Sequence, residues 1–206
     1  NAYNRCNKIL IINHIQGMTM NHNNEVKTIV FPVAGIGSRF LPATKSVAKE
    51  LLPVLNRPLI EYAVEEAINS GIEKFIFITS PSKQNITGHF KINTELQELI
   101  KIKDKILFSS ITKYLLPEDK VIEVTQSEPR GLGHAIWCAR QHIDNKPFAV
   151  ILPDDLVVSK EPCIKQLLNI YNKRHNNIIA LKEVNKSDTS KYGIIEYLEY
   201  ENNTFN

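Results

Sequence analysis

The sequence predicts an α/β fold in which helices cover both faces of a mostly parallel β-sheet. From Lys27 onward, short apolar runs rich in β-branched residues alternate with segments of helical spacing. Repeated right-handed crossovers of this kind produce a parallel sheet. The chain of 206 residues is 43% hydrophobic and 23% charged, so it can bury one sizeable core. In such a sheet we expect a ligand beyond the carboxyl ends of the strands.

The first strand is predicted at residues 28–33 (TIVFPV), a short apolar run before a glycine-bearing loop. Residues 34–57 carry two prolines among small and charged residues, which favours a long ordered loop over a continuous helix. Pro58 then stands at the favoured first position of a helix, and Gly71 stands where a C-terminal cap belongs.

The remaining elements follow the same alternation of strand and helix. We expect strands at 75–79, 121–125, 148–152 and 177–182, two short helices within 83–106, helices at 131–142 and 163–171, and a β-rich tail at 192–200.

The first 24 residues are rich in asparagine, and we expect them to be a peripheral extension of a single domain at residues 25–206. The apolar stretch from Ile9 to Ile12 is too short for a secretory signal, which needs roughly 7 to 15 such residues. A natural start at Met18 or Met20 is our hypothesis.

Composition points to a cytoplasmic protein without a membrane span or a nucleic-acid partner. No window approaches the roughly 18 apolar residues of a spanning helix. The net charge of +3 is spread along the chain without long basic runs. Cysteines stand only at 6, 138 and 163, without the paired spacing of a zinc site, so reduced thiols are the simplest account.

The loop after the first strand, Ala34 to Pro42 (AGIGSRFLP), has the chemistry of a phosphate cradle. Without a Cβ, Gly35 and Gly37 can turn their backbone N–H groups toward phosphate oxygens, and Arg39 adds a rigid fork of donors. A P-loop would need Gly-Lys-Ser/Thr, and a dinucleotide fingerprint would need a third glycine at a helix opening. The sequence has neither, which weakens both alternatives, including a dinucleotide oxidoreductase.

A Gly-x-Gly after a strand is more often a tight turn than a ligand site. Here Arg39, Lys45 and Lys49 crowd into one short loop. A merely structural turn has no evident use for that concentrated positive charge, so we favour phosphate binding.

Three ordered segments resemble the sugar-nucleotide pyrophosphorylases, and most closely the bacterial UTP-glucose-1-phosphate uridylyltransferases. They are AGIGSRFLPATKSVAKELLPVLNRPLIEYAVEEA from Ala34, QSEPRGLGHA from Gln126 and VILPDD from Val150. A weaker echo stands at Tyr192-Gly193, so the resemblance covers nearly everything from Lys27 onward. It implies a Rossmann-like fold of the nucleotide-diphospho-sugar transferase type.

For the phosphate loop, the resemblance implies that the backbone of Ala34 and Gly35 approaches the nucleotide. It also implies that Arg39 and Lys49 bind the triphosphate and that Glu50 lies near the base. Ala48 departs from the proline usual in glucose-specific members, which puts loop stiffness and the exact substrate in question.

For the base, Gln126 resembles the family glutamine that reads uracil. One amide can donate to a carbonyl and accept from a ring N–H. Gly131 would let backbone reach the base edge. The alternative for Gln126 is a solvated polar residue of a loop. His134 and Trp137 are interpreted as packing or helix-surface residues.

For the metal and the sugar, the resemblance implies that Asp154 holds Mg²⁺, which prefers a few carboxylates and phosphate oxygens. Asp155 would assist or cap a helix, and Gly193 would leave room for the hexose. A carboxylate after a strand is otherwise most often a turn former or helix cap.

The implied reaction joins UTP and glucose 1-phosphate into UDP-glucose and releases pyrophosphate. The family continues for roughly another hundred residues, with a Glu-Lys-Pro segment absent here, so we expect an incomplete C-terminus, with self-association possible through surface left exposed. Two alternatives stay open: a thymidylyltransferase of the same family, and a truncated UTP-binding module without catalysis.

Overall fold

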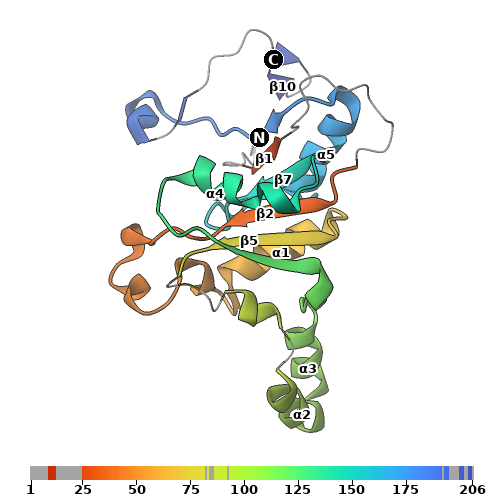
Figure 1. The fold of residues 1–206 in the computed structure, drawn as a ribbon. Helices are drawn as coiled ribbons and strands as arrows, with labels where there is room; N and C mark the ends of the chain where they lie inside the picture. The colour runs from red at the N-terminus through yellow and green to blue at the C-terminus, as the bar shows by residue number, and fades with distance from the viewer. Residues whose placement is uncertain are drawn as a thin grey trace.

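A six-stranded sheet is the centre of the molecule in the computed structural model, which describes residues 9–12, 25–81, 83, 86–91, 93–191, 193–194, 200–201 and 204–205. The strand order is β6-β5-β2-β7-β1-β8 (Figure 1). The strands are β1 (Ile9–Ile12), β2 (Thr28–Pro32), β5 (Lys74–Thr79), β6 (Val121–Thr125), β7 (Phe148–Ile151) and β8 (Ile178–Ile179).

Four neighbouring strands, β6, β5, β2 and β7, run parallel. Strand β1 runs opposite to the other five strands of this sheet and pairs antiparallel with β7 and β8. The mostly parallel sheet predicted from the alternating pattern is therefore confirmed. The register aligns Pro32 with Ile78 and Thr79 with Thr125, so the strands end at one common edge.

The helices are α1 (Leu59–Asn69), α2 (Thr94–Lys103), α3 (Lys105–Thr112), α4 (Leu132–Cys138) and α5 (Cys163–Arg174). Three of them, α1, α4 and α5, cover the two faces of the sheet, as the sequence predicts. Helices α1 and α5 pack with one buried cluster, and α4 packs with the other.

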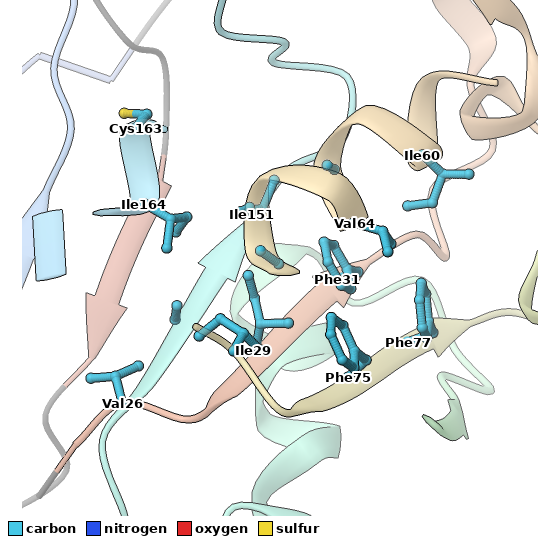
Figure 2. Packing of buried hydrophobic residues seen from close by; sticks show 14 of the residues in the cluster. Val26, Ile29, Phe31, Ile60, Val64, Phe75, Phe77, Ile151, Cys163 and Ile164 are labelled. Atoms are coloured by element: carbon cyan, nitrogen blue, oxygen red, sulfur yellow. The ribbon is translucent and has the colours of Figure 1, made fainter. Parts of the chain in front are cut away.

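The two clusters arise from the two-residue alternation of the buried strands. Phe31 of β2 and Phe77 of β5 point to the face of α1, where their rings stack with centroids 5.0 Å apart. Figure 2 shows these rings beside Ile60 and Val64 of α1. Val30, the next residue along β2, points to the opposite face and packs in the cluster that includes α4. Strands β2 and β5 are thus apolar on both faces, as expected of the buried centre of a parallel sheet.

Helix α1 begins one residue after the predicted position, because Pro58 forms its N-cap with extended backbone. It ends as predicted before Gly71, which has φ +86°. Glu66 of α1 also reaches the first turn of α5, where its Oε1 accepts the Ile164 N–H at 2.8 Å.

The long loop between β2 and α1 contains no continuous helix, which confirms the reading of its prolines. It consists of the 3-10 turns η1 (Ser38–Phe40), η2 (Ala43–Lys45) and η3 (Lys49–Leu51), followed by a hairpin of β3 (Pro53–Val54) and β4 (Arg57–Pro58).

Helices α2 and α3 form a hairpin that projects away from the sheet (Figure 1). Side chains cap both helices: Asn93 accepts from Leu96 N–H at 3.0 Å, and Asp104 accepts from Ile106 N–H at 2.9 Å. The pair of short helices expected within 83–106 is realised as one 3-10 turn, η4 (Thr87–Phe90), and α2. Helix α3 lies almost entirely beyond that range and was not predicted.

The expectation that residues 1–24 lie peripheral to the fold is wrong for Ile9–Ile12. These four residues form β1, in which Leu10 pairs with Val150 of β7 and with Ile179 of β8. The backbone of β1 therefore closes an edge of β7 that would otherwise lie open.

The remaining predicted elements differ mainly in length. The predicted helix at 131–142 is α4 followed by the 3-10 turn η6 (Ala139–His142). The predicted strand at 177–182 is reduced to β8. Of the predicted tail at 192–200, residues 192 and 195–199 lie outside the described residues. Its last residue begins β9 (Tyr200–Glu201), which pairs with β10 (Thr204–Phe205).

Candidate functional site

Most of the predicted site residues follow the carboxyl ends of the parallel strands. The glycine loop follows β2, Gln126 follows β6, and Asp154 follows β7. Lys83, which the sequence analysis did not select, follows β5. Because these strands end at one edge of the sheet, their loops gather there.

The glycine loop needs its second glycine for steric reasons. Gly37 has φ +73°, and a Cβ there would lie 3.2 Å from Thr44 Cγ2 and 3.3 Å from Lys49 Cβ. The Thr44 hydroxyl also donates to the Gly37 carbonyl at 2.8 Å. At Gly35 a Cβ would meet nothing within 4 Å, so Gly35 leaves open space beside an exposed stretch of backbone.

Two of the three cations of this loop face solvent. Arg39 and Lys45 are exposed, and within the described part of the chain Arg39 forms no ion pair. Lys49 differs, because its Nζ donates to Asp154 Oδ2 at 2.7 Å, joining η3 to the turn after β7. The loop after β2 and the aspartate after β7 therefore lie on the same side of the sheet.

Glu50 is enclosed behind this loop. Its side chain is 0% exposed, and its Oε2 accepts from Lys83 Nζ at 3.0 Å. The same ammonium group donates to the Val33 carbonyl at 3.2 Å, just before the glycine loop. Burial raises the pKa of the Glu50 carboxyl, and the charge of Lys83 opposes that rise.

The second oxygen of Glu50 has no hydrogen-bond partner in the described structure, and Lys49 Nζ lies 3.9 Å from it. The carboxylate thus sits between two lysines. Because the side chain is fully buried and lies next to Lys49 and Lys83, it can influence the positions of these two ammonium groups. The expectation that Glu50 lies near the base stays a prediction.

Gln126 is 6% exposed and is held by its neighbours rather than solvated. Its backbone N–H donates to Thr79 O at 2.8 Å. Its side-chain Nε2 lies 3.2 Å from Gly131 O and 2.9 Å from His134 Nδ1. Sequence reasoning treated His134 as a packing or surface residue and missed this contact.

Gly131 has φ +92° and ψ 177°, a region that residues with a Cβ rarely adopt. This conformation starts α4 and directs the Gly131 carbonyl to both Ala135 N–H, at 3.1 Å, and Gln126. Trp137 is 57% exposed on α4 and is a surface residue, as predicted.

Asp154 is the candidate metal ligand. Its side chain is 34% exposed. Among the described residues there is no cluster of three or more histidine, cysteine, aspartate or glutamate side chains that could hold a metal. Mg²⁺ commonly takes only one or two carboxylates together with substrate phosphates. The partly exposed carboxylate of Asp154, which already accepts a hydrogen bond from the Lys49 ammonium group, fits that chemistry.

The predicted sugar contact is not joined to the rest of the site. Gly193 is exposed, and a Cβ there would meet open space. No hydrogen bond or ion pair within the described residues links Gly193 to the glycine loop, Gln126 or Asp154. Tyr192 lies outside the described residues.

The assembled edge offers cations, backbone N–H groups, a carboxylate and an amide within one set of loops. This set suits a nucleoside triphosphate, whose phosphates need positive charge and whose base needs directed hydrogen bonds. No helix in the described ranges has the length and apolar character to cross a membrane.

Two curated relatives illustrate the sequence similarity. The chain is 44% identical over 181 residues to UTP-glucose-1-phosphate uridylyltransferase 1 of Staphylococcus saprophyticus, covering 88% of this chain and 63% of that protein. It is also 44% identical over 172 residues to the UTP-glucose-1-phosphate uridylyltransferase of Komagataeibacter xylinus, covering 83% and 61%. The chain thus spans less than two thirds of these curated relatives.

Solved structures agree with the sequence relatives. A UDP-glucose pyrophosphorylase complexed with UDP-glucose matches with a TM-score of 0.73 and 36% identity, over 87% of this chain and 66% of that one. A UTP-bound UGPase from Acinetobacter baumannii matches with a TM-score of 0.67 and 40% identity, over 73% and 54%.

The family model of the nucleotidyl transferases matches residues 28–203, which is most of the chain and includes every predicted site residue. The strands whose ends carry the site lie in the same range. This chain belongs to the nucleotidyl transferase family.

Proposed function

We propose that the protein transfers a uridylyl group from UTP to glucose 1-phosphate, forming UDP-glucose and pyrophosphate. The observation that carries this proposal is the 2.7 Å contact between Lys49 and Asp154, which unites the cationic loop after β2 with the carboxylate after β7. The names of the sequence relatives and the UTP and UDP-glucose complexes among similar structures support the choice of substrates.

In the proposed reaction, a phosphate oxygen of glucose 1-phosphate attacks the α-phosphorus of UTP. The new P–O bond forms as the bond between the α-phosphorus and the bridging oxygen breaks, and pyrophosphate leaves with the bonding electrons. No covalent enzyme intermediate is required. The protein aligns the two anions and offsets the charge that concentrates between them.

Arg39 and Lys49 are the proposed catalytic cations. Arg39 is exposed and free of ion pairs among the described residues, so its guanidinium can donate to phosphate oxygens without first breaking a contact. Lys49 is held at the mouth of the loop by Asp154 and lies beside Glu50, which keeps it near the position where phosphate would bind. The backbone of Ala34, Gly35 and Gly37 would add N–H donors.

Asp154 is the proposed ligand of Mg²⁺, with Lys49 as its partner in the absence of the ion. Bound Mg²⁺ would neutralise phosphate charge and orient the triphosphate. Lys49 would then be free to turn from the carboxylate to a phosphate oxygen or to the unpartnered Oε1 of Glu50.

Gln126 and Gly131 are proposed to contact the base, and Gly193 the hexose. Burial and two hydrogen bonds orient the Gln126 amide, as base recognition requires. We further propose that the enzyme works in the cytoplasm and can form homo-oligomers.

Titration of the 206-residue chain with UTP and Mg²⁺, followed by an assay of pyrophosphate release with glucose 1-phosphate, tests the proposal. Release that falls about a hundredfold in Arg39→Ala supports a transferase, since removing one such charge contact costs about 3 kcal/mol. Near-normal release in Arg39→Ala would remove Arg39 from its role.

The second candidate is a UTP-binding module without catalysis, which is favoured because, among the described residues, the nucleotide-binding loops are joined to one another but not to Gly193. It predicts UTP binding without release of pyrophosphate. A competition experiment between UTP and thymidine triphosphate separates these two candidates, which prefer UTP, from a thymidylyltransferase, which prefers thymidine triphosphate.

A further inference from the structure

The amide of Gln126 has a fixed orientation. Gly131 O lies 3.2 Å from one of its terminal atoms. A carbonyl oxygen can only accept, so the atom facing it must be the amide nitrogen, Nε2. The Gly131 carbonyl is itself held in place, since it also accepts the Ala135 N–H at the start of α4.

His134 uses the same nitrogen. Its Nδ1 lies 2.9 Å from Gln126 Nε2, and because Nε2 is a donor, Nδ1 must accept. The imidazole is therefore neutral, with its proton on its own Nε2. A protonated ring, or the opposite tautomer, would place two donors against each other.

Both hydrogens of the Gln126 amide are consequently directed to protein acceptors, Gly131 O and His134 Nδ1. The side chain is almost enclosed, and its backbone N–H is fixed to Thr79 O on the end of β5. The atom left to meet a ligand is Oε1, which can only accept.

We propose that His134 is a positioning residue for base selection: by holding Nε2 of Gln126, it makes the amide present an acceptor and so favours a base with a ring N–H at that point. Uracil and thymine carry such an N–H at N3, whereas cytosine carries a lone pair there. This inference rests on the proposed role of Gln126 in reading the base.

The test compares the affinities of the wild-type chain and His134 variants for UTP, CTP and dTTP by calorimetry. His134→Leu removes the acceptor. His134→Asn is the matched control, because its Oδ1 stands where Nδ1 of the imidazole stood. We expect His134→Leu to lower the ratio of UTP to CTP affinity by about tenfold, the effect of one hydrogen bond of about 1.4 kcal/mol. His134→Asn should retain most of the wild-type ratio.

The ratio of UTP to dTTP affinity is an internal check, since both bases present the same N–H edge, and it should not change. A general loss of packing would lower all three affinities together and leave both ratios unchanged, which overturns the inference. Absence of UTP binding by the wild-type chain overturns the proposed function and this inference with it. Wild-type selectivity that survives in His134→Leu overturns the inference alone.

A second measurement reads the His134 ring of the wild-type chain directly. ¹⁵N chemical shifts of the histidines, assigned with His134→Asn as the reference, report the tautomer of His134. The geometry predicts a neutral ring protonated at Nε2. A ring protonated at Nδ1 would contradict the hydrogen bond on which the inference depends.

Discussion

Lys49 Nζ donates to Asp154 Oδ2 across 2.7 Å, although the two residues lie 105 positions apart in the chain. The contact joins the turn η3, which contains Lys49, to the loop after β7, which contains Asp154. Since both groups are partly exposed, with side-chain accessibilities of 17% and 34%, the pair can separate when a ligand arrives. The pair therefore contributes little to the free energy of unfolding, and its main effect is to position the two charged groups.

The buried pair behind this loop predicts a large stability effect at Lys83. Lys83→Met leaves the fully buried Glu50 carboxylate without its partner, so we expect a loss of about 3 kcal/mol in the free energy of unfolding. The double variant Lys83→Met/Glu50→Gln removes the charge as well and should recover most of that loss. Urea unfolding measures both, and equal stability of the two variants would contradict the pairing.

Glu66 predicts a dependence of stability on pH. Burial raises the pKa of its carboxyl above 4.5, while backbone hydrogen bonds from Ile164 and Cys163 oppose the rise. The folded state then binds a proton where the unfolded chain does not, so the stability contributed by Glu66 declines as pH rises from 4.5 through the raised pKa.

Glu66→Gln keeps an acceptor for the Ile164 N–H but removes the titration. We expect a flatter pH profile of unfolding free energy in this window, with stability at neutral pH equal to the wild type or higher. Glu66→Ala, which also loses the acceptor, should be less stable by about 1 kcal/mol. A wild-type slope that persists in Glu66→Gln would assign the titration to another group.

We expect a substitution at Leu55 to stabilise the protein. It has φ +58° in the two-residue loop between β3 and β4 and is 93% exposed, so its side chain gains little from packing. Asparagine tolerates this left-handed conformation better than leucine. Leu55→Asn should raise the free energy of unfolding by about 0.5 to 1 kcal/mol in thermal denaturation. Leu55→Ala lacks the side-chain amide by which asparagine hydrogen-bonds to nearby backbone, so it is the control that should show no such gain.

We expect a variant that lacks residues 1–17 to be less stable, because it loses β1, which pairs with both β7 and β8. A loss of about 2 kcal/mol would lower Tm by about 4 to 8 °C for a protein of this size. An unchanged Tm by calorimetry would show that the pairing of β1 adds nothing to the fold.

The sequence predicts the strands of the parallel sheet and α1 well because their signals are local. Thr28 to Val33 is apolar on both faces, and Pro58 and Gly71 bracket a helix with one buried stripe. Strand β1 has no such signal, since Ile9–Ile12 is a short apolar run whose partners, β7 and β8, lie far along the chain.

The residues of the candidate site also differ in whether their signal is local in the sequence. A glycine loop with clustered cations is visible locally, and so is an aspartate after a strand. The burial of Glu50 between Lys49 and Lys83 is not, because a lysine after a strand normally faces solvent. The role of His134 depends on the turn at Gly131, which brings it to Gln126, eight positions earlier.

The most direct test of the central claim, that Asp154 and the cationic loop hold a triphosphate together with Mg²⁺, is calorimetric titration of UTP with and without Mg²⁺. We expect Mg²⁺ to tighten UTP binding to the wild-type chain by at least about tenfold. In Asp154→Asn that gain should disappear, while binding without Mg²⁺ stays as strong or stronger because Lys49 is released. An undiminished gain from Mg²⁺ in Asp154→Asn would contradict the account.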